Sequence, residues 1–143
     1  VVVGDGEERR RLEALAARIS SPVVFAGHQP DPRPFIADCD VILSTADREP
    51  LGLSVLEALS MARPVIAFSG GGIPEIVRHG VTGLLVAEPT PAAFAAAIVA
   101  ARNDPFLVAQ MGARGRQFAE AQAHLDGMCE GYAAAYRSLP RSP

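Results

Sequence analysis

The chain has 143 residues, 49% of them hydrophobic and 20% charged, which suits one domain with a sizeable core. All 13 cationic residues are arginines, so a Schiff-base lysine, a pyridoxal-phosphate anchor and the lysine of a Walker phosphate loop are excluded. The net charge of -3 provides no broad basic field, and we therefore expect no nucleic-acid partner.

Cysteine usage and hydropathy indicate a cytoplasmic protein. Cys39 and Cys129 lie too far apart in the sequence for a CxxC zinc pair and are too few for a disulfide scaffold, so we expect reduced thiols. No apolar run reaches the roughly 18 to 20 residues of a membrane span, and no signal-peptide pattern opens the chain. Because the sequence starts on Val1 without a Met, we expect a piece of a longer polypeptide.

The predicted elements alternate between short apolar runs and helical patterns. A strand at residues 1–3 ends in Gly4-Asp5-Gly6, and a helix follows at 7–19. The next predicted elements are a strand at 22–26, a helical turn at 35–38, a strand at 41–43, a helix at 50–62, a strand at 65–68, a turn of helix at 73–77 and a strand at 84–86. Strands that are continuously apolar and alternate with helices predict an α/β fold: a Rossmann-like, doubly wound parallel sheet with helices on both faces.

Helices dominate the C-terminal third of the chain. Thr90-Pro91 and Asp104-Pro105 each place a capping side chain before a Pro, which predicts two helix starts. A third helix is predicted at 124–138. Its Tyr132 and Tyr136 share one face, as do Leu107, Met111 and Phe118 in the preceding helix, and we interpret both faces as packing stripes rather than sites.

Ligands of open parallel sheets bind beyond the carboxyl ends of the strands, so the loops after strands are the candidate sites. The Gly4-Asp5-Gly6 loop lacks the third glycine of a dinucleotide fingerprint, because Arg9 stands at that position, and a plain tight turn is the better interpretation. His28, after Gly27, is either a solvated loop residue, which we favour, or a ligand contact.

The loop before the helix at 50–62 is the most informative. Pro50 suits a first helical position and disfavours helical backbone at Glu49, so we expect the helix to begin at Pro50 with Glu49 at its cap. The unpaired amides would then belong to Leu51, Gly52 and Leu53, and such a helix terminus binds phosphate. Gly52 would let a bulky anion approach the backbone.

Glu57 follows on the same helix, which is apolar nearly all round and is therefore expected to be buried. A buried carboxylate needs a partner. At roughly 7 to 8 Å beyond Gly52 along the axis, Glu57 suits a ribose whose diphosphate lies on the helix terminus. A structural ion pair with an Arg explains Glu57 equally well, and ordinary capping explains Glu49 equally well. The loop at 70–75 is either a substrate edge or a tight crossover.

Together these motifs strongly resemble the C-terminal domain of group 1 (family 4) retaining glycosyltransferases of the GT-B fold. The resemblance runs from Val1 to about Tyr136 and is carried by Glu49-Pro50-Leu51-Gly52, Glu57-Ala58-Leu59, Arg63-Pro64-Val65-Ile66-Ala67, Gly71-Gly72-Ile73-Pro74-Glu75-Ile76-Val77 and His79-Gly80-Val81-Thr82-Gly83-Leu84-Leu85-Val86.

The resemblance implies a donor site for a nucleotide-sugar, namely a UDP-, GDP- or ADP-sugar. Glu49 would be the catalytic residue, facing the transferred sugar. The amides of Leu51, Gly52 and Leu53 would hold sugar or diphosphate oxygens, Glu57 the ribose, and His28 would lie near the base. The implied reaction transfers the sugar to an acceptor hydroxyl with retention of configuration, without a metal or a cofactor.

The sequence departs from the family in two respects. Ala62 stands where the family commonly has Gly, which could shift the helix end. The resemblance also implies an opening strand-helix unit with the cations that clamp the diphosphate, and an N-terminal acceptor domain. Both would lie upstream of Val1, so we expect this chain alone to be inactive. We also expect any association with a membrane surface to involve only the absent part.

Two alternatives remain: a non-catalytic nucleotide-binding or scaffold module of GT-B fold, and a GT-B sugar-nucleotide epimerase. The acceptor stays unknown.

Overall fold

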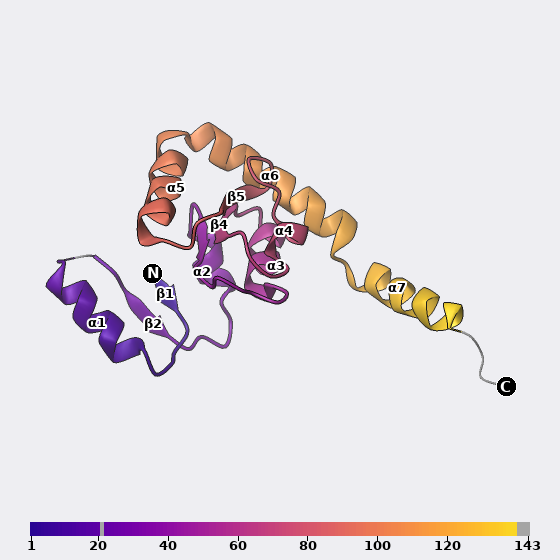
Figure 1. The fold of residues 1–143 in the computed structure, drawn as a ribbon, viewed down its shortest axis with the longest axis horizontal. Coiled ribbons are helices and arrows are strands. Elements are labelled where there is room, and N and C mark those ends of the chain that lie inside the picture. The colour runs from indigo at the N-terminus through magenta and orange to yellow at the C-terminus, as the bar shows by residue number, and fades with distance from the viewer. Residues whose placement is uncertain (21, 140–143) are drawn as a thin grey trace. The chain divides into compact units, whose positions relative to one another are not determined.

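The computed structural model describes residues 1–20 and 22–139 and divides into two compact units (Figure 1). The first unit comprises residues 1–38 and the second residues 39–143.

The first unit is a small strand-helix-strand arrangement. Its elements are β1 (Val2–Val3), α1 (Arg9–Arg18), β2 (Phe25–Gly27) and the short α2 (Arg33–Ala37). β1 pairs with β2 in parallel, with a register irregularity between Val2 and Val3. The order of elements agrees with the sequence prediction, but β2 begins at Phe25 rather than at residue 22.

The second unit contains a three-stranded sheet in the order β3-β4-β5, in which all strands run parallel. Its strands are β3 (Ile42–Ser44), β4 (Val65–Phe68) and β5 (Gly83–Val86). Its helices are α3 (Leu53–Ser60), α4 (Ile73–Ile76), α5 (Pro91–Asn103), α6 (Pro105–Gln122) and α7 (Leu125–Ser138).

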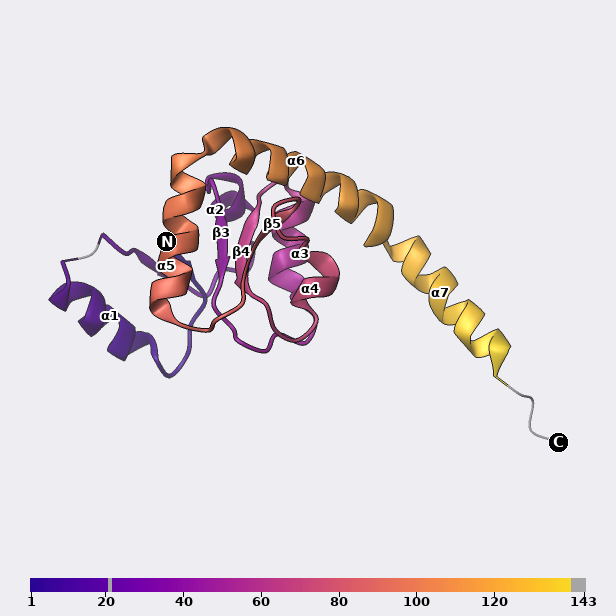
Figure 2. The ribbon, with the colours of Figure 1, turned by 45° about the horizontal axis from the view of Figure 1, so that its top comes forward.

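Helices cover both faces of this sheet (Figure 2). On one face, α3 and α4 bury Leu59 and Ile73 against Val65 and Ala67. On the other face, Phe94 and Ala101 of α5 pack with Ile66 and Val86. Successive β4 residues therefore alternate between two apolar layers, as a central strand requires. The predicted α/β fold with a parallel sheet between helices is confirmed.

Glycines allow α6 to approach α3 closely. A Cβ on Gly115 would lie 2.6 Å from Leu59 Cδ2, and one on Gly112 would overlap the carbonyl oxygen of Ala62. Arg116 Nη1 also donates to the Ser60 carbonyl at 2.8 Å, which satisfies an acceptor at the end of α3. α6 thereby fixes the C-terminal end of the helix on which the predicted site lies.

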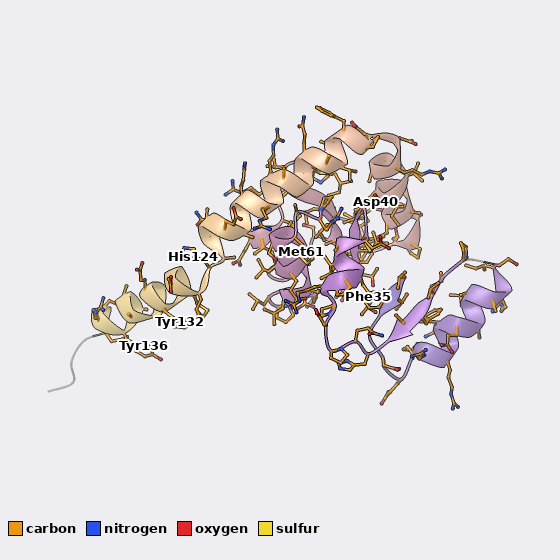
Figure 3. The ribbon with its side chains drawn as sticks, turned by 180° about the vertical axis from the view of Figure 1, so that it is seen from behind. Phe35, Asp40, Met61, His124, Tyr132 and Tyr136 are labelled. Carbon is orange, nitrogen blue, oxygen red and sulfur yellow. The ribbon has the colours of Figure 1, made fainter. Side chains whose placement is uncertain are left out.

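Both predicted proline starts are confirmed. Thr90 Oγ1 accepts from the Ala93 amide at 3.2 Å, and Asp104 Oδ1 accepts from the Leu107 amide at 2.9 Å. The predicted packing stripe of the last helix is wrong within the described chain. Tyr132 and Tyr136 of α7 are 62% and 72% exposed, and α7 has no buried residue among those described (Figure 3).

Over residues 1–20 and 22–139, no single helix combines the length and apolar character of a membrane span. Only α5 and α6 taken together meet those two criteria, and they are bent by 99° at their junction.

Candidate functional site

Three loops follow the carboxyl ends of the strands in the second unit. β3, β4 and β5 end at Ser44, Phe68 and Val86, and the register pairs Ser44 with Ala67 and Phe68 with Val86. The loops at 45–52, 69–72 and 87–90 therefore leave the sheet at one edge, where open parallel sheets bind their ligands.

The first two of these loops are joined through their backbones. Glu49 and Gly71 form a parallel bridge, and the Gly72 amide donates to the Glu49 carbonyl at 2.9 Å. A Cβ on Gly70 would overlap the Asp47 carbonyl oxygen, and one on Gly71 would overlap that of Glu49. The glycine run is thus required for a tight crossover, which is one of the two interpretations of that loop.

The predicted start of α3 is wrong. The helix begins at Leu53, three residues after Pro50, and Gly52 is its N-cap with φ 75° and ψ 54°. The bridge to Gly71 keeps Glu49 extended, so the chain reaches helical geometry only after the left-handed Gly52. The first-turn amides therefore belong to Leu53, Ser54 and Val55, and that of Val55 already donates to the Gly52 carbonyl at 2.9 Å.

Gly52 is buried, and its lack of a side chain serves packing. A Cβ there would lie 2.8 Å from Ile73 Cδ1, so Ile73 occupies the side from which an anion was expected to approach. The Gly52 amide donates to Glu49 Oε1 at 3.1 Å. Of the three predicted amide donors, that of Gly52 therefore already donates a hydrogen bond within the protein.

Glu49 is half-buried and lies at the positive end of α3. Its carboxylate bonds the amide of the N-cap residue, a capping contact of the kind the sequence left open. Leu51 and Leu53 on either side of Gly52 are 56% and 65% exposed, so the loop surface next to this carboxylate is open.

Glu57 is exposed, so its predicted burial is wrong in this chain. α3 turns Val55, Ala58 and Leu59 toward the core and leaves Leu53 and Glu57, one turn apart, on its open side. Within the described residues no ion pair of Glu57 is found, so a structural partner does not account for it.

His28 lies in the first unit, exposed after β2, whereas the other candidate residues lie in the second unit. Its neighbour Asp5 accepts a bond from the Gly6 amide at 2.9 Å and another from Arg9 Nη1 at 2.9 Å. These two bonds, with a smaller contribution from the charge of His28, hold the pKa of Asp5 below its ordinary value of 3.8. The hydrogen bonds that Arg9 donates to Glu13 and Asp5 raise the pKa of its guanidinium.

A cavity of about 490 Å³ opens at the carboxyl edge of the sheet. It is lined by Phe68, the last residue of β4, and by residues of all three loops: Asp47, Arg48, Ser69, Gly70, Gly71, Ala87 and Pro89. Sequence reasoning did not assign Asp47, Arg48 or Ser69 to a site, although their position directly after strands was a usable signal.

A second cavity, of about 500 Å³, lies near the amino ends of β3 and β4, where Val41 and Pro64 precede the strands. Its lining is mostly apolar and includes Leu43, Ile66 and Ile98, with Asp40 among its few polar residues (Figure 3). The cavity at the carboxyl edge is the better candidate for a ligand, because open parallel sheets bind their ligands at that edge and the glycine loop brings backbone groups to its lining.

Comparison with known proteins identifies the family of the chain. The profile of the family described as "Glycosyl transferases group 1" matches residues 1–104. The chain is 34% identical to the lipopolysaccharide core biosynthesis glycosyltransferase LpsE of Rhizobium meliloti, over 97% of this chain and 42% of LpsE. It is 30% identical to the N-acetyl-alpha-D-glucosaminyl L-malate synthase of Bacillus anthracis, over 99% of this chain and 38% of that enzyme.

Solved structures show the same fold. Anabaena HepE in complex with UDP-glucose superposes with a TM-score of 0.85 at 29% identity, over 96% of this chain and 40% of HepE. The sucrose-phosphate synthase of Thermosynechococcus elongatus gives a TM-score of 0.84 at 31% identity, over 94% of this chain and 35% of that one.

The chain spans well under half the length of each of these four proteins. A structure described as the C-terminal domain of a group 1 family glycosyl transferase from Francisella tularensis matches with a TM-score of 0.73 at 21% identity, over 82% of this chain and 63% of that domain. The parallel sheet, the carboxyl-edge loops and the matched profile together show that the chain belongs to the group 1 glycosyl transferases and has the fold of their C-terminal GT-B domain.

Proposed function

We propose that the chain is the donor-binding half of a retaining, metal-independent glycosyltransferase that uses a nucleotide-sugar. The observation that carries this proposal is the start of α3, where Glu49 lies at the helix terminus and Glu57 stands exposed one turn beyond Leu53. The complex of the similar HepE with UDP-glucose supports a nucleotide-sugar as the donor.

Each group at this terminus has a distinct role in the proposal. The exposed Glu57 accepts hydrogen bonds from the ribose hydroxyls. The amides of Leu53 and Ser54, which have no acceptor within the helix, and the helix dipole stabilise negative charge on the diphosphate. Glu49 uses Oε1 for the Gly52 amide and offers Oε2 to a hydroxyl of the transferred sugar.

The arrangement acts electrostatically. Departure of the nucleoside diphosphate develops charge on its oxygens, and oriented amides at a helix terminus stabilise such charge without reorganising. The acceptor hydroxyl then attacks the same face of the sugar and gives its proton to an oxygen of the departing diphosphate. Attack on that face retains the anomeric configuration. His28 contributes near the base in this proposal.

The proposal is tested by titrating the chain with UDP, GDP and ADP while amide NMR shifts are recorded. Glu57→Gln is expected to weaken binding by about 1.5 to 3 kcal/mol, the range for hydrogen bonds to a charged group. Glu75→Gln is the matched control, because Glu75 is also exposed but lies in the first turn of α4. If both variants weaken nucleotide binding equally, Glu57 does not bind the ribose.

A substitution of Glu49 distinguishes contacts to the transferred sugar from contacts to the nucleotide. In a polypeptide that also carries the rest of the enzyme, Glu49→Ala is expected to lower turnover strongly and to leave the affinity for free diphosphate nearly unchanged. Equal loss of affinity for the diphosphate and for the intact donor would assign Glu49 to the nucleotide instead.

We further propose that an opening strand-helix unit and an N-terminal acceptor domain complete the enzyme. The chain covers only 42% of LpsE and 40% of HepE, which supports this proposal. A site between two domains loses proximity and desolvation when one is absent. The chain alone is therefore expected to bind nucleotide no tighter than roughly millimolar and to transfer no sugar. Turnover by the purified 143-residue chain would disprove the proposal that these further parts are needed to complete the active site.

A further inference from the structure

The helix α7 is held differently from the two helices before it. Thr90 and Asp104 cap α5 and α6 from just before a proline, and both of these helices bury residues in the second unit. α7 has no proline in its first turn and no buried residue among those described. Isolated helices shorter than about 12–15 residues are marginal in water, and α7 has 14 residues. The formation of α7 should therefore depend on contacts within the helix itself.

The cap of α7 is a histidine. His124 is the N-cap residue, with φ -95° and ψ 153°, and its Nδ1 accepts a hydrogen bond from the Gly127 amide at 3.1 Å. The imidazole lies over Gly127, because a Cβ there would come within 3.0 Å of His124 Cε1. Figure 3 shows His124 at the junction between α6 and α7. This side chain thus satisfies one of the amides that the start of a helix leaves unpaired.

This cap works only with a neutral imidazole. Nδ1 accepts a hydrogen bond only while it carries no proton, and a protonated ring has donors at both nitrogens. Protonation would therefore set the Nδ1 proton against the Gly127 amide proton, and it would place a positive charge at the positive end of the helix. The hydroxyl of Thr90 and the carboxylate of Asp104 still accept between pH 5 and 8, the range in which histidine ordinarily changes charge.

The charged groups next to His124 do not replace this cap. Glu120, in the last turn of α6, already accepts from Arg116 Nε at 2.7 Å. Asp126, in the first turn of α7, would attract a protonated imidazole and so offset part of the loss, but that attraction leaves the Gly127 amide without its acceptor. His124 takes part in none of the ion pairs found among the described residues.

We propose that His124 is a pH-sensitive switch for α7: the neutral imidazole holds the first turn of the helix, and protonation releases it. Because the helical form binds this proton less readily than the frayed form, α7 is stable above the pH range in which the imidazole titrates and loosens below it. The exposed apolar face of Leu125, Met128, Tyr132 and Tyr136 exists only while α7 is helical, so acid also disperses this face. The inference stands independently of the proposed function.

The test is an NMR titration of the 143-residue chain from pH 8 to pH 5. The ¹³Cα shifts of residues 125–128 are expected to lose helical character with the same midpoint as the ring protons of His124. The ratio of frayed to helical first turn should rise on the order of fivefold, as expected when one N-cap is lost. The first turns of α5 and α6 are internal references and should not change.

Three variants identify the cause. His124→Asn provides a side-chain oxygen that accepts at any pH, so the first turn should stay helical from pH 8 to pH 5. His124→Ala should fray the first turn equally at both ends of the range. His28→Asn removes another exposed imidazole, in the first unit, and should leave the transition of α7 unchanged.

Four outcomes would overturn the inference. The first is a wild-type α7 without a transition, and the second is a transition that persists in His124→Asn. The third is a His124→Ala variant that is as helical as the wild type at pH 8. The fourth is a loss of helical shifts in the first turns of α5 and α6 at the same midpoint, because general acid unfolding would then explain the change.

Discussion

Ala62 adopts a left-handed backbone with φ 57°, directly after the C-cap of α3. The Arg63 amide donates to the Ala58 carbonyl at 2.9 Å and the Ala62 amide to that of Leu59 at 3.0 Å, the two bonds of a Schellman motif. Left-handed geometry costs an L-residue about 1–2 kcal/mol, and glycine avoids this cost. Glycine also gives the unfolded chain more conformational freedom, which lowers the free energy of unfolding by about 0.4–1 kcal/mol. Ala62→Gly should therefore raise the free energy of unfolding by about 0.5–1 kcal/mol, as measured by urea denaturation.

Ala123→Gly is the matched control for this substitution. Ala123 is the C-cap of α6 but has φ -120°, a region open to any residue. Glycine relieves no strain there and only adds freedom to the unfolded chain, so a small loss of stability is expected. A gain of similar size in both variants would show that strain at Ala62 is not the cause.

At the level of elements, the crossover between the 45–52 and 69–72 loops sets the position of Glu49. Gly71 has φ 60°, and a Cβ there would overlap the Glu49 carbonyl oxygen, whereas Gly80 has φ 70° and a Cβ there would meet no atom within 4 Å. Gly80→Ala should thus cost only the backbone strain of about 1–2 kcal/mol. Gly71→Ala should cost about 1–3 kcal/mol more, because the two loops must separate.

Urea denaturation of the two glycine variants measures this difference, and the 2.9 Å bond from the Gly72 amide to the Glu49 carbonyl provides a structural readout. Slower amide exchange at Gly72 in Gly80→Ala than in Gly71→Ala is expected. Equal stability losses in both variants would mean that the crossover tolerates a side chain and does not hold Glu49.

The elements were predictable where the signal is local. Apolar runs such as Val65–Phe68 predicted the strands, and a side chain before a proline predicted the starts of α5 and α6. The start of α3 was not predictable from Pro50, because a bridge to Gly71, far along the chain, keeps the backbone extended.

The candidate site was predictable to the level of the loop but not of each contact. The sequence identified Glu49, Gly52 and Glu57 from their positions after a strand and along a helix. It could not reveal that Gly52 packs on Ile73 or that Glu57 is exposed, since both depend on which faces of α3 meet other elements. Asp47 and Arg48 remained unassigned because their significance comes from a cavity built by three separate loops.

At the scale of the whole molecule, the two units differ in how much they bury. Among the described residues, every buried hydrophobic side chain except Ile36 lies in the second unit. In the first unit α1 has no buried residue, and β1 is two residues long. Domains below about 40 residues rarely fold without further support, and the first unit ends at Asp38.

Native-state hydrogen exchange on the 143-residue chain should therefore separate the units. Amides of β4 and β5 are expected to exchange slowest, because opening them requires the two apolar layers around Ile66 and Ala67 to come apart. Amides of α1 and β2 should exchange at least about a hundredfold faster, through opening of the first unit alone. Their protection should fall first as urea is added, while the second unit keeps its cooperative transition. If both units instead lose protection together at every urea concentration, the chain unfolds as one body. The unequal burial would then not give the two units separate stabilities.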